Sequence, residues 1–329
     1  MKKIILSMFA CMLVFLMLGA CKKNNDDKVI VGISKLLQHP ALDACEQGIQ
    51  DAISDRGITV EYDLQNANND LSTASQIANK FKSEKVKVAV GIATPAAQSL
   101  AKTLTKIPVV FTAVTDPVGS ELVKTIEHGD GNVTGASDKI ATADNITLFK
   151  QIADIKTMGY IYTPAEANSL TELASVRDGA AALGIELVEQ TVNTTADVKQ
   201  AAQSIVNRID GIYLSTDNTV FGALPAIIDV FKNAKKPIFA GDASGAKNGG
   251  CMIASGSNYY RLGYSTGNIV ADILEGKSPS DIPIKFATEP SELDLLIDLD
   301  AAELCNITIP QSIIDAATMI YQNGQLIER

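Results

Sequence analysis

Hydroxyl, amide and carboxylate side chains follow most of the short apolar runs in this 329-residue sequence. Ligands of open parallel sheets bind outside the carboxyl ends of the strands, so side chains at these positions could contact a small solute. The same residue types also cap helices, and for any one position a cap is the simpler interpretation. Their recurrence predicts a polar cleft with these candidate ligand-binding residues: Ser34, Thr94, Pro95, Ala96, Thr115, Asp116, Glu166, Asn168, Ser169, Asp217, Asn218 and Asp242.

The segment ATPAAQSL offers a more particular chemistry, the binding of an anion. Thr94 can cap a helix, Pro95 suits the first turn, and the small side chain of Ala96 leaves the backbone amides uncovered. Free amides and the helix dipole attract a carboxylate at such an N-terminus. A plain capped helix is the alternative. The glycine-rich run GAKNGG over 245–250 matches neither common phosphate-binding pattern, so it supports nucleotide binding only weakly.

Catalytic and metal-binding patterns are sparse. A Ser–His–acid set needs a histidine base, and His39 and His128 are the only two histidines. His39 lies in QHPALD at a strand-to-helix turn, but no GxSxG accompanies it, and CxxC and HExxH are absent. Acids such as Asp116, Asp217 and Asp242 could equally serve an ammonium ligand. We therefore predict that the protein is not an enzyme and has no cofactor and no metal.

Alternating strand and helix patterns must position these residues. Beta-branched runs and helical patterns follow one another along the chain, which predicts parallel sheets with right-handed crossovers. Segments 86–117 and 208–242 match element for element, each running strand, turn, helix, X-Pro, strand and aspartate. The fold class is therefore α/β, with two similar doubly wound parallel-sheet lobes. We also expect single helices over 218–234 and 309–321.

The expected division of the chain follows from these patterns. The first lobe takes residues 29–141 with about 258–285, and the second lobe takes 142–257 with part of 286–329. Because late elements must return to earlier lobes, the chain would cross between them more than once, which makes a multi-strand hinge.

The N-terminal sequence predicts a secretion signal followed by a membrane tether. Lys2 and Lys3 precede the apolar run 4–20, which is at the short limit for a membrane span and fits a signal peptide over residues 1–20. Leu-Gly-Ala-Cys at 18–21 resembles the lipobox of bacterial lipoproteins, which implies cleavage before Cys21 and its lipidation. Residues 21–28 would then form a short polar tether, so the body would lie outside the cytoplasm and touch the membrane through its lipid anchor only.

Charge and cysteine content exclude other classes. The chain has a formal net charge of −10 and no basic stripe, so nucleic acid is excluded as a partner. Cys45, Cys251 and Cys305 are widely spaced and odd in number, so they do not form a disulfide framework.

Several motifs together resemble one known family. They are HPALD, TPAAQSL, VFTAVTDPVGSELV, GNVTGASD, YTPAEANS and LSTDNTV, and the resemblance spans nearly all of residues 28–310. This combination resembles the substrate-binding lipoproteins of ABC transporters associated with tryptophan and tyrosine uptake. The resemblance implies the periplasmic-binding-protein type I fold. It also implies a monomer that captures a small solute, often an aromatic amino acid, and delivers it to a permease driven by a separate ATPase.

Roles carried over by position stay implications of this resemblance. The turn Thr94-Pro95-Ala96 would receive a ligand carboxylate, and Asp217 with Asn218 would take the ammonium. The remaining contacts would come from Ser34, Thr115 and Asp116 in the first lobe and from Glu166, Asn168 and Ser169 in the second. Aromatic side chains that could stack on the ligand, although core packing explains each as well, are Phe111, Tyr162, Tyr213 and Phe221. Three alternatives stay open: a ligand-sensing receptor subunit of the same fold, a binder of a sugar-like or nucleoside-like solute, and a hydrolase that uses His39.

Overall fold

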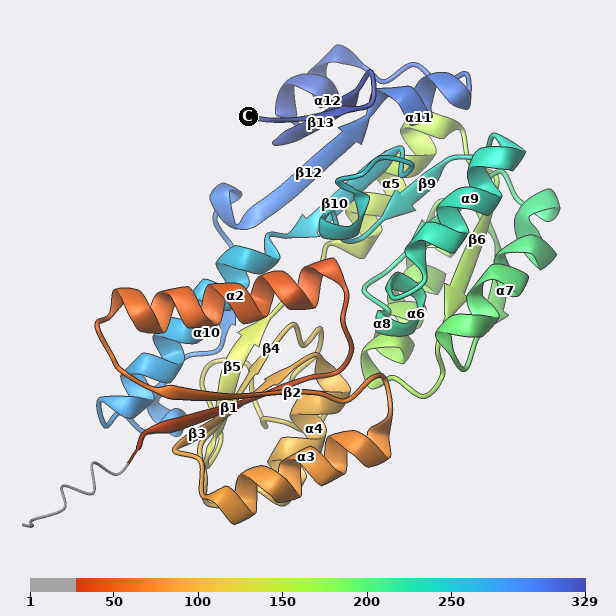
Figure 1. Cartoon of the computed structure of the whole chain (residues 1–329). Coiled ribbons are helices and arrows are strands. Elements are labelled where there is room, and N and C mark those ends of the chain that lie inside the picture. The colour runs from red at the N-terminus through yellow and green to blue at the C-terminus, as the bar shows by residue number, and fades with distance from the viewer. Residues whose placement is uncertain (1–27) are drawn as a thin grey trace, which may run out of the picture.

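The computed structural model describes residues 28–329 as two sheets, each flanked by helices on both faces (Figure 1). The predicted signal peptide, Cys21 and nearly all of the tether lie outside the described residues. The first sheet has the strand order β11-β5-β4-β3-β1-β2, and the second has the order β14-β13-β12-β10-β9-β8-β6-β7. The α/β class with two doubly wound, mainly parallel sheets is thereby confirmed.

The first sheet is parallel throughout. Its strands are β1 (Ile30–Lys35), β2 (Glu61–Asn66), β3 (Val88–Ile92), β4 (Val109–Thr112), β5 (Val133–Ser137) and β11 (Lys285–Phe286). One face packs on α2 (Pro40–Asp55) and α10 (Tyr259–Leu274), and the other on α3 (Leu71–Glu84) and α4 (Thr94–Thr103). A Cβ on Gly263 would lie 2.2 Å from the carbonyl oxygen of Cys45, so only glycine allows α10 to approach α2 this closely. We call this sheet with its helices the first lobe.

The second sheet is mixed, because β10 pairs antiparallel with β12, and β13 with β14. Its strands are β6 (Thr157–Tyr162), β7 (Glu186–Thr191), β8 (Gly211–Leu214), β9 (Ile238–Ala240), β10 (Ile253–Ser257), β12 (Leu293–Asp298), β13 (Met319–Gln322) and β14 (Gln325–Glu328). Its helices are α5 (Thr142–Ala153), α6 (Ala167–Ala182), α11 (Leu299–Leu304) and α12 (Gln311–Ala316) on one face, and α7 (Val198–Ile205), α8 (Asn218–Phe221) and α9 (Leu224–Ala234) on the other. We call this sheet with its helices the second lobe.

Three crossings join the lobes. The chain passes from the first sheet to the second after β5, returns after β10 to form α10, and passes over again between β11 and β12. The multi-strand hinge expected from the sequence is therefore present. The residue boundaries predicted for the lobes stay a prediction.

Two predicted helices differ from the structure. The helix expected over 218–234 is divided into α8 and α9, because Pro225 has no amide to continue a helix and instead sits in the first turn of the next one. The terminal helix expected over 309–321 is wrong beyond Ala316, where β13 and β14 form a hairpin. Asn323 and Gly324 both have positive φ, 54° and 73°, as a tight hairpin turn requires.

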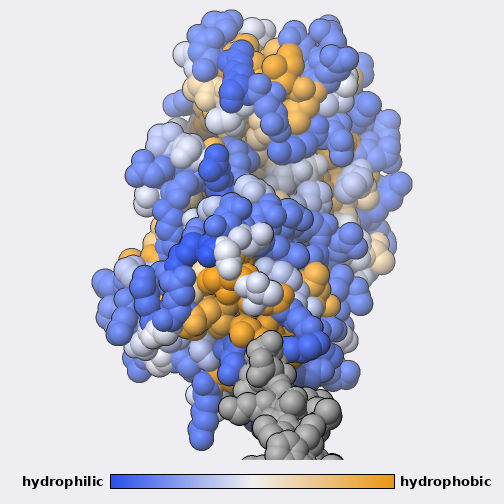
Figure 2. All heavy atoms as spheres, turned by 60° about the vertical axis from the view of Figure 1, so that its left-hand side comes forward, coloured by the Kyte–Doolittle hydropathy of each residue, from blue (hydrophilic) through white to orange (hydrophobic). Residues whose placement is uncertain are grey.

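The largest buried side chains come from strands and helices alike, and they pack between the sheets and the helices to form the cores of the two lobes. The face seen in Figure 2 is mostly hydrophilic, with apolar side chains gathered in separate small areas. Within residues 28–329, every helix is too short or too polar to cross a membrane.

Candidate functional site

A small cavity lies between the lobes, where the carboxyl ends of strands from both sheets meet. The residues that line it are His39, Leu42, Ala113, Asp138, Thr216, Asp217, Asn218, Phe221, Asp242 and Tyr259. Its volume is about 10 Å³, which is at the lower limit of the space that a cavity needs to hold one water molecule. The two lobes are therefore closed on each other, and a larger solute can enter only if they part.

Two hydrogen bonds hold the lobes together beside the cavity. The hydroxyls of Thr115 and Thr216 are 3.2 Å apart, and the Asn69 side-chain amide donates to the Thr219 hydroxyl at 2.9 Å. All four residues belong to loops or first helical turns after strands, so both contacts can form only when the lobes are closed.

The first-lobe side of the cleft holds strained backbone and hydroxyls without partners. Ala93, just before α4, has φ 81° and ψ 153°, a conformation that costs a non-glycine residue about 1–3 kcal/mol. This turn presents the backbone amides of Thr94 and Ala96 at the start of α4, because Pro95 has no amide. Among the described residues, the buried hydroxyls of Thr94 and Ser34 have no hydrogen-bond partner.

The second-lobe side contains two buried acids that are already fully engaged. The two oxygens of Glu166 accept hydrogen bonds from the side chain of Asn168 and from the backbone and side chains of Asn218 and Thr219. The oxygens of Asp217 accept from Thr163, Ser169 and Val220. Burial, together with the negative charge of Glu166, raises the pKa of Asp217 to about 7. We call Glu166 and Asp217 the anchored acids, since they hold loops of the second lobe in place.

Two other buried acids, Asp138 and Asp242, keep acceptor capacity. A carboxylate offers about four acceptor positions. Asp138 accepts from the Thr115 hydroxyl at 3.2 Å and the Tyr259 hydroxyl at 2.8 Å, and Asp242 accepts from the Ser244 amide at 2.7 Å. Burial raises the pKa of both acids, that of Asp242 to about 6. We call these two residues the open acids.

His39 lies on the opposite wall of the cavity from the second-lobe acids. It is 8% exposed, and in the described part of the chain neither ring nitrogen has a hydrogen-bond partner. Burial lowers the pKa of His39 to about 4, so the ring is neutral near pH 7. The nearby cation Lys35 is paired with Asp43 at 2.5 Å and with Glu46 at 3.3 Å.

The structure brings only some of the sequence-predicted residues to the cavity wall. Asp217, Asn218 and Asp242 line it. Four more predicted residues are hydrogen-bonded to residues of the wall, namely Thr115, Glu166, Asn168 and Ser169. The other predicted residues, Ser34, Thr94, Pro95 and Ala96, are buried in the first lobe and are not among the lining residues. Asp116 is half-buried and accepts from the Gly119 amide at 2.9 Å, so it shapes a turn.

The list of candidate ligand-binding residues predicted from the sequence lacks Asp138, Ala113 and Tyr259, although Asp138 is one of the polar residues that follow the expected strands. Asp138 and Ala113 directly follow β5 and β4, so the rule that ligands bind at the carboxyl ends of strands applies to both, although the apolar side chain of Ala113 gives no polar signal. Tyr259 begins α10 at a crossing between the lobes, and nothing in its local sequence marks that position. Three of the proposed stacking residues, Phe111, Tyr162 and Tyr213, are absent from the cavity wall in the described chain, whereas Phe221 lines it.

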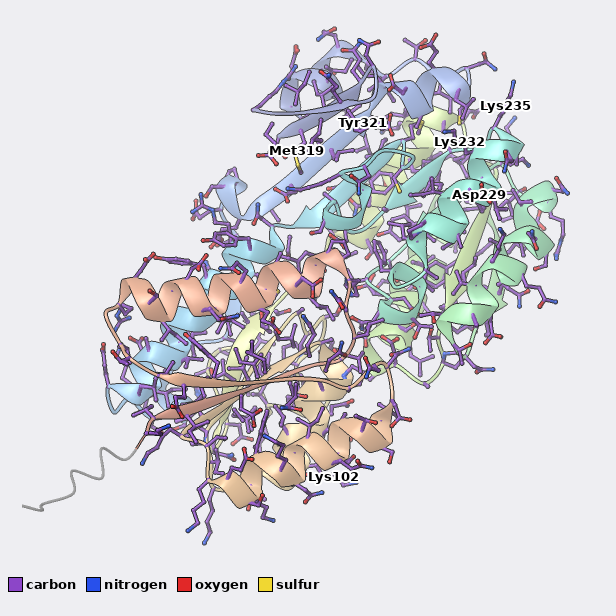
Figure 3. The ribbon with its side chains drawn as sticks, viewed as in Figure 1. Lys102, Asp229, Lys232, Lys235, Met319 and Tyr321 are labelled. Carbon is purple, nitrogen blue, oxygen red and sulfur yellow. The ribbon has the colours of Figure 1, made fainter. Side chains whose placement is uncertain are left out.

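A second hollow of about 350 Å³ lies at the other end of the second lobe, where Lys232 and Tyr321 line it (Figure 3). Its acid Asp298 accepts from the Gly250 amide at 2.6 Å and so serves the local backbone. Among residues 28–329 no group of His, Cys, Asp and Glu side chains could hold a metal ion. The interlobe cavity is therefore the better candidate site.

Comparisons with known proteins point to one family. The family model described as ABC transporter substrate binding protein matches residues 30–320. A curated relative, the tyrosine-binding protein of Clostridioides difficile (strain R20291), is 36% identical, and the match covers 91% of each chain.

Two solved structures bear on the arrangement of the lobes. The ABC domain from Streptococcus pneumonia in complex with L-Trp is 29% identical, with a TM-score of 0.84 over 89% of this chain and 99% of that one. The ligand-free, open structure of a substrate-binding protein with adhesive properties from Clostridium difficile is 35% identical, with a TM-score of 0.64 over 85% of this chain and 96% of that one.

Proposed function

This chain belongs to the family of ABC transporter substrate-binding proteins, and from that premise we propose that it captures an aromatic amino acid between its two lobes. Delivery to a permease driven by a separate ATPase would follow. One observation supports an amino acid as the ligand. Asp138, Asp217 and Asp242 line the interlobe cavity, and within the described chain no lysine or arginine lines it. Buried carboxylates without a cation favour a ligand that brings a positive charge, such as an α-ammonium group.

The open acids are the proposed ammonium ligands. Asp138 follows β5, where the chain first crosses from the first lobe to the second, and Asp242 belongs to the second lobe, so an ammonium between them would join both lobes. Asp217, assigned this role by the family resemblance, already accepts hydrogen bonds from three residues. We therefore assign Asp217 and Glu166 to holding the second-lobe loops.

The first turn of α4 is the proposed carboxylate site. Its strained approach at Ala93 exposes the amides of Thr94 and Ala96, and the hydroxyls of Thr94 and Ser34 are buried without partners. Amides at a helix N-terminus, supported by hydroxyl donors, suit a carboxylate. The walls formed by Leu42, Phe221 and Tyr259 would then enclose the aromatic side chain.

Closure of the lobes is the proposed mechanism of capture. This chain is more similar in shape to the L-Trp complex than to the ligand-free open structure, although its sequence is more similar to the latter. That contrast supports a hinge motion in which the present structure is the closed form. A ligand favours closure only through contacts that it makes in the closed state and lacks in the open one, and the pair of open acids is such a contact.

Membrane anchoring is the remaining part of the proposal. We propose that Cys21, outside the described residues, carries lipid and holds the body on the extracytoplasmic face of the membrane. Cys21→Ala should move the protein from the membrane fraction to the soluble fraction while its ligand affinity stays the same. An affinity that falls in the released protein would contradict this separation of roles.

A ligand panel tests the proposed function. Isothermal titration and thermal unfolding should be measured with L-tyrosine, L-tryptophan, glucose and adenosine, and with two analogues of tyrosine: tyramine, which lacks the carboxylate, and 3-(4-hydroxyphenyl)propionate, which lacks the ammonium. At 100 times the dissociation constant a ligand stabilises the fold by about 2.7 kcal/mol. We expect the two amino acids to stabilise the protein and the propionate to fail most clearly. Stabilisation by the sugar or the nucleoside alone would overturn the ligand class.

A further inference from the structure

His39 occupies a helix-cap position without acting as a cap. It is the residue before α2 and has extended backbone angles, φ −157° and ψ 162°, but its side chain makes no capping hydrogen bond. Instead the imidazole is a wall of the interlobe cavity, and both nitrogens are buried without a partner among residues 28–329. A buried polar group left unpaired costs about 1–3 kcal/mol, so its presence here requires an explanation.

The cavity wall that includes His39 has apolar and polar side chains. The side chain of Asn218 interacts with the imidazole and partly offsets the effect of burial on its pKa, although no hydrogen bond of good geometry joins the two side chains. Leu42, Ala113 and Phe221 have no side-chain hydrogen-bonding groups, and the Tyr259 hydroxyl donates to Asp138 at 2.8 Å. Asp138 thus has a partner in Tyr259, and within residues 28–329 no hydrogen bond joins either open acid to the imidazole.

A catalytic explanation does not fit His39. A histidine base activates a serine, threonine or cysteine by hydrogen bonding to it. In the described part of the chain no such contact reaches either ring nitrogen. The unpaired ring is better explained by a partner that arrives with the ligand.

We propose that His39 is a specificity-determining residue that accepts a hydrogen bond from a ring O–H or N–H of an aromatic amino acid. This inference rests on the proposed function and extends it to a choice among aromatic ligands. A neutral imidazole has one acceptor nitrogen and one donor nitrogen, so it can pair with the phenol of tyrosine or with the indole N–H of tryptophan. Phenylalanine has neither group and leaves the ring unpaired. A site built to hydrogen-bond a ring substituent discriminates strongly against the ligand that lacks it.

Two variants with matched shape test this role. His39→Met replaces the ring with an apolar side chain, whereas His39→Gln keeps a donor and an acceptor. Dissociation constants should be measured by isothermal titration for L-tyrosine, L-tryptophan and L-phenylalanine. We expect the wild-type protein to bind tyrosine and tryptophan at least about tenfold more tightly than phenylalanine. His39→Met should weaken tyrosine binding by about 10- to 100-fold and leave phenylalanine within about threefold, and His39→Gln should recover part of the difference.

The outcomes separate this inference from the proposed function. Phenylalanine binding reports that each variant is folded, and 4-fluorophenylalanine tests the wild-type protein without any mutation, since it should bind like phenylalanine. Equal affinities of the wild-type protein for tyrosine and phenylalanine, or a preference that persists in His39→Met, would overturn the role of His39 and leave amino-acid binding intact. If the wild-type protein binds none of these amino acids, the proposed function itself fails.

Discussion

The anchored acids and the open acids are equally buried but differ in how their oxygens are used. Glu166 and Asp217 accept hydrogen bonds from loops of their own lobe, chiefly over 163–169 and 216–220. Asp138 and Asp242 have fewer donors and lie on different lobes. Burial alone therefore does not identify a binding residue. A carboxylate that its own fold has satisfied stabilises the fold, and one that retains acceptor capacity at a cavity wall is available to a ligand.

Removing an open acid should give the largest effect on binding. Asp242→Asn keeps the shape of the side chain but loses the negative charge that would face the ligand ammonium. Loss of one partner of a buried charge pair costs about 2–5 kcal/mol, so we expect affinity for the amino acid to fall by about 100-fold or more in isothermal titration. The midpoint of thermal unfolding without ligand should not fall, because an uncompensated buried charge has been removed. A binding constant that stays near the wild-type value would remove the distinction between the two pairs.

Removing an anchored acid should lower the stability of the folded protein, even without ligand. Glu166→Gln places an amide NH₂ among groups that all donate, so we expect the free energy of unfolding to fall by about 2 kcal/mol in urea denaturation without ligand. Glu189→Gln is the matched control, since Glu189 pairs with Arg177 at the surface and should lose less than about 1 kcal/mol. Equal losses in the two variants would show that the Glu166 network does not hold the loops.

Ligand affinity and folding stability should depend on pH in opposite directions. Burial raises the pKa of Asp242 to about 6 in the folded protein, above its unfolded value of 3.8, so its protonation favours the folded state. Stability from this group is present at low pH and is lost as the pH rises through about 6. Affinity runs the other way, because the ammonium needs the ionised acid, and should fall about tenfold per pH unit below 6.

The control for this pH dependence is Asp242→Asn. Titrations between pH 5 and 8 should show a shallower dependence of affinity on pH in that variant, because Asp138 is then the open acid that still titrates. Its stability should still vary with pH, because burial also raises the pKa of Asp217 and Glu172 to about 7. An affinity in the variant that keeps the wild-type slope would assign the titration to another group.

The contact between the lobes beside the open acids should have the smallest effect. Asn69→Gly removes the hydrogen bond to Thr219 but tolerates the positive φ of 61° at this position. One hydrogen bond is worth about 1 kcal/mol, so affinity should fall about fivefold, mainly through faster dissociation in stopped-flow measurements. Asn68→Gly is the control, because Asn68 also has positive φ and its side chain is exposed. Equal dissociation rates in both variants would show that this contact does not secure closure.

Much of the fold could be predicted from local patterns. Hydrophobic periodicity, with the turn residues between periodic runs, predicts the alternation of strands and helices and the matching segments 86–117 and 208–242. The repeated crossings between the lobes follow from the order of these elements. The C-terminal hairpin could also have been predicted, since Asn323-Gly324 is a strong turn signal. The apolar residues before it recur at helical spacing, and this led us to extend the predicted helix beyond its end at Ala316.

Local sequence patterns are enough to tell which residue types follow the strands, and thus that the cleft is polar. Which of the buried acids keep free acceptor positions depends instead on the packing of the folded chain. Thr163 donates to Asp217 across 54 positions, and Tyr259 donates to Asp138 across 121. A hydrogen-bond acceptor is filled or left free by neighbours that the packing of distant loops supplies, and no local pattern records those neighbours. The same reason applies to His39, because its place at a strand-to-helix turn is visible in the sequence but its lack of a partner is a property of the closed lobes.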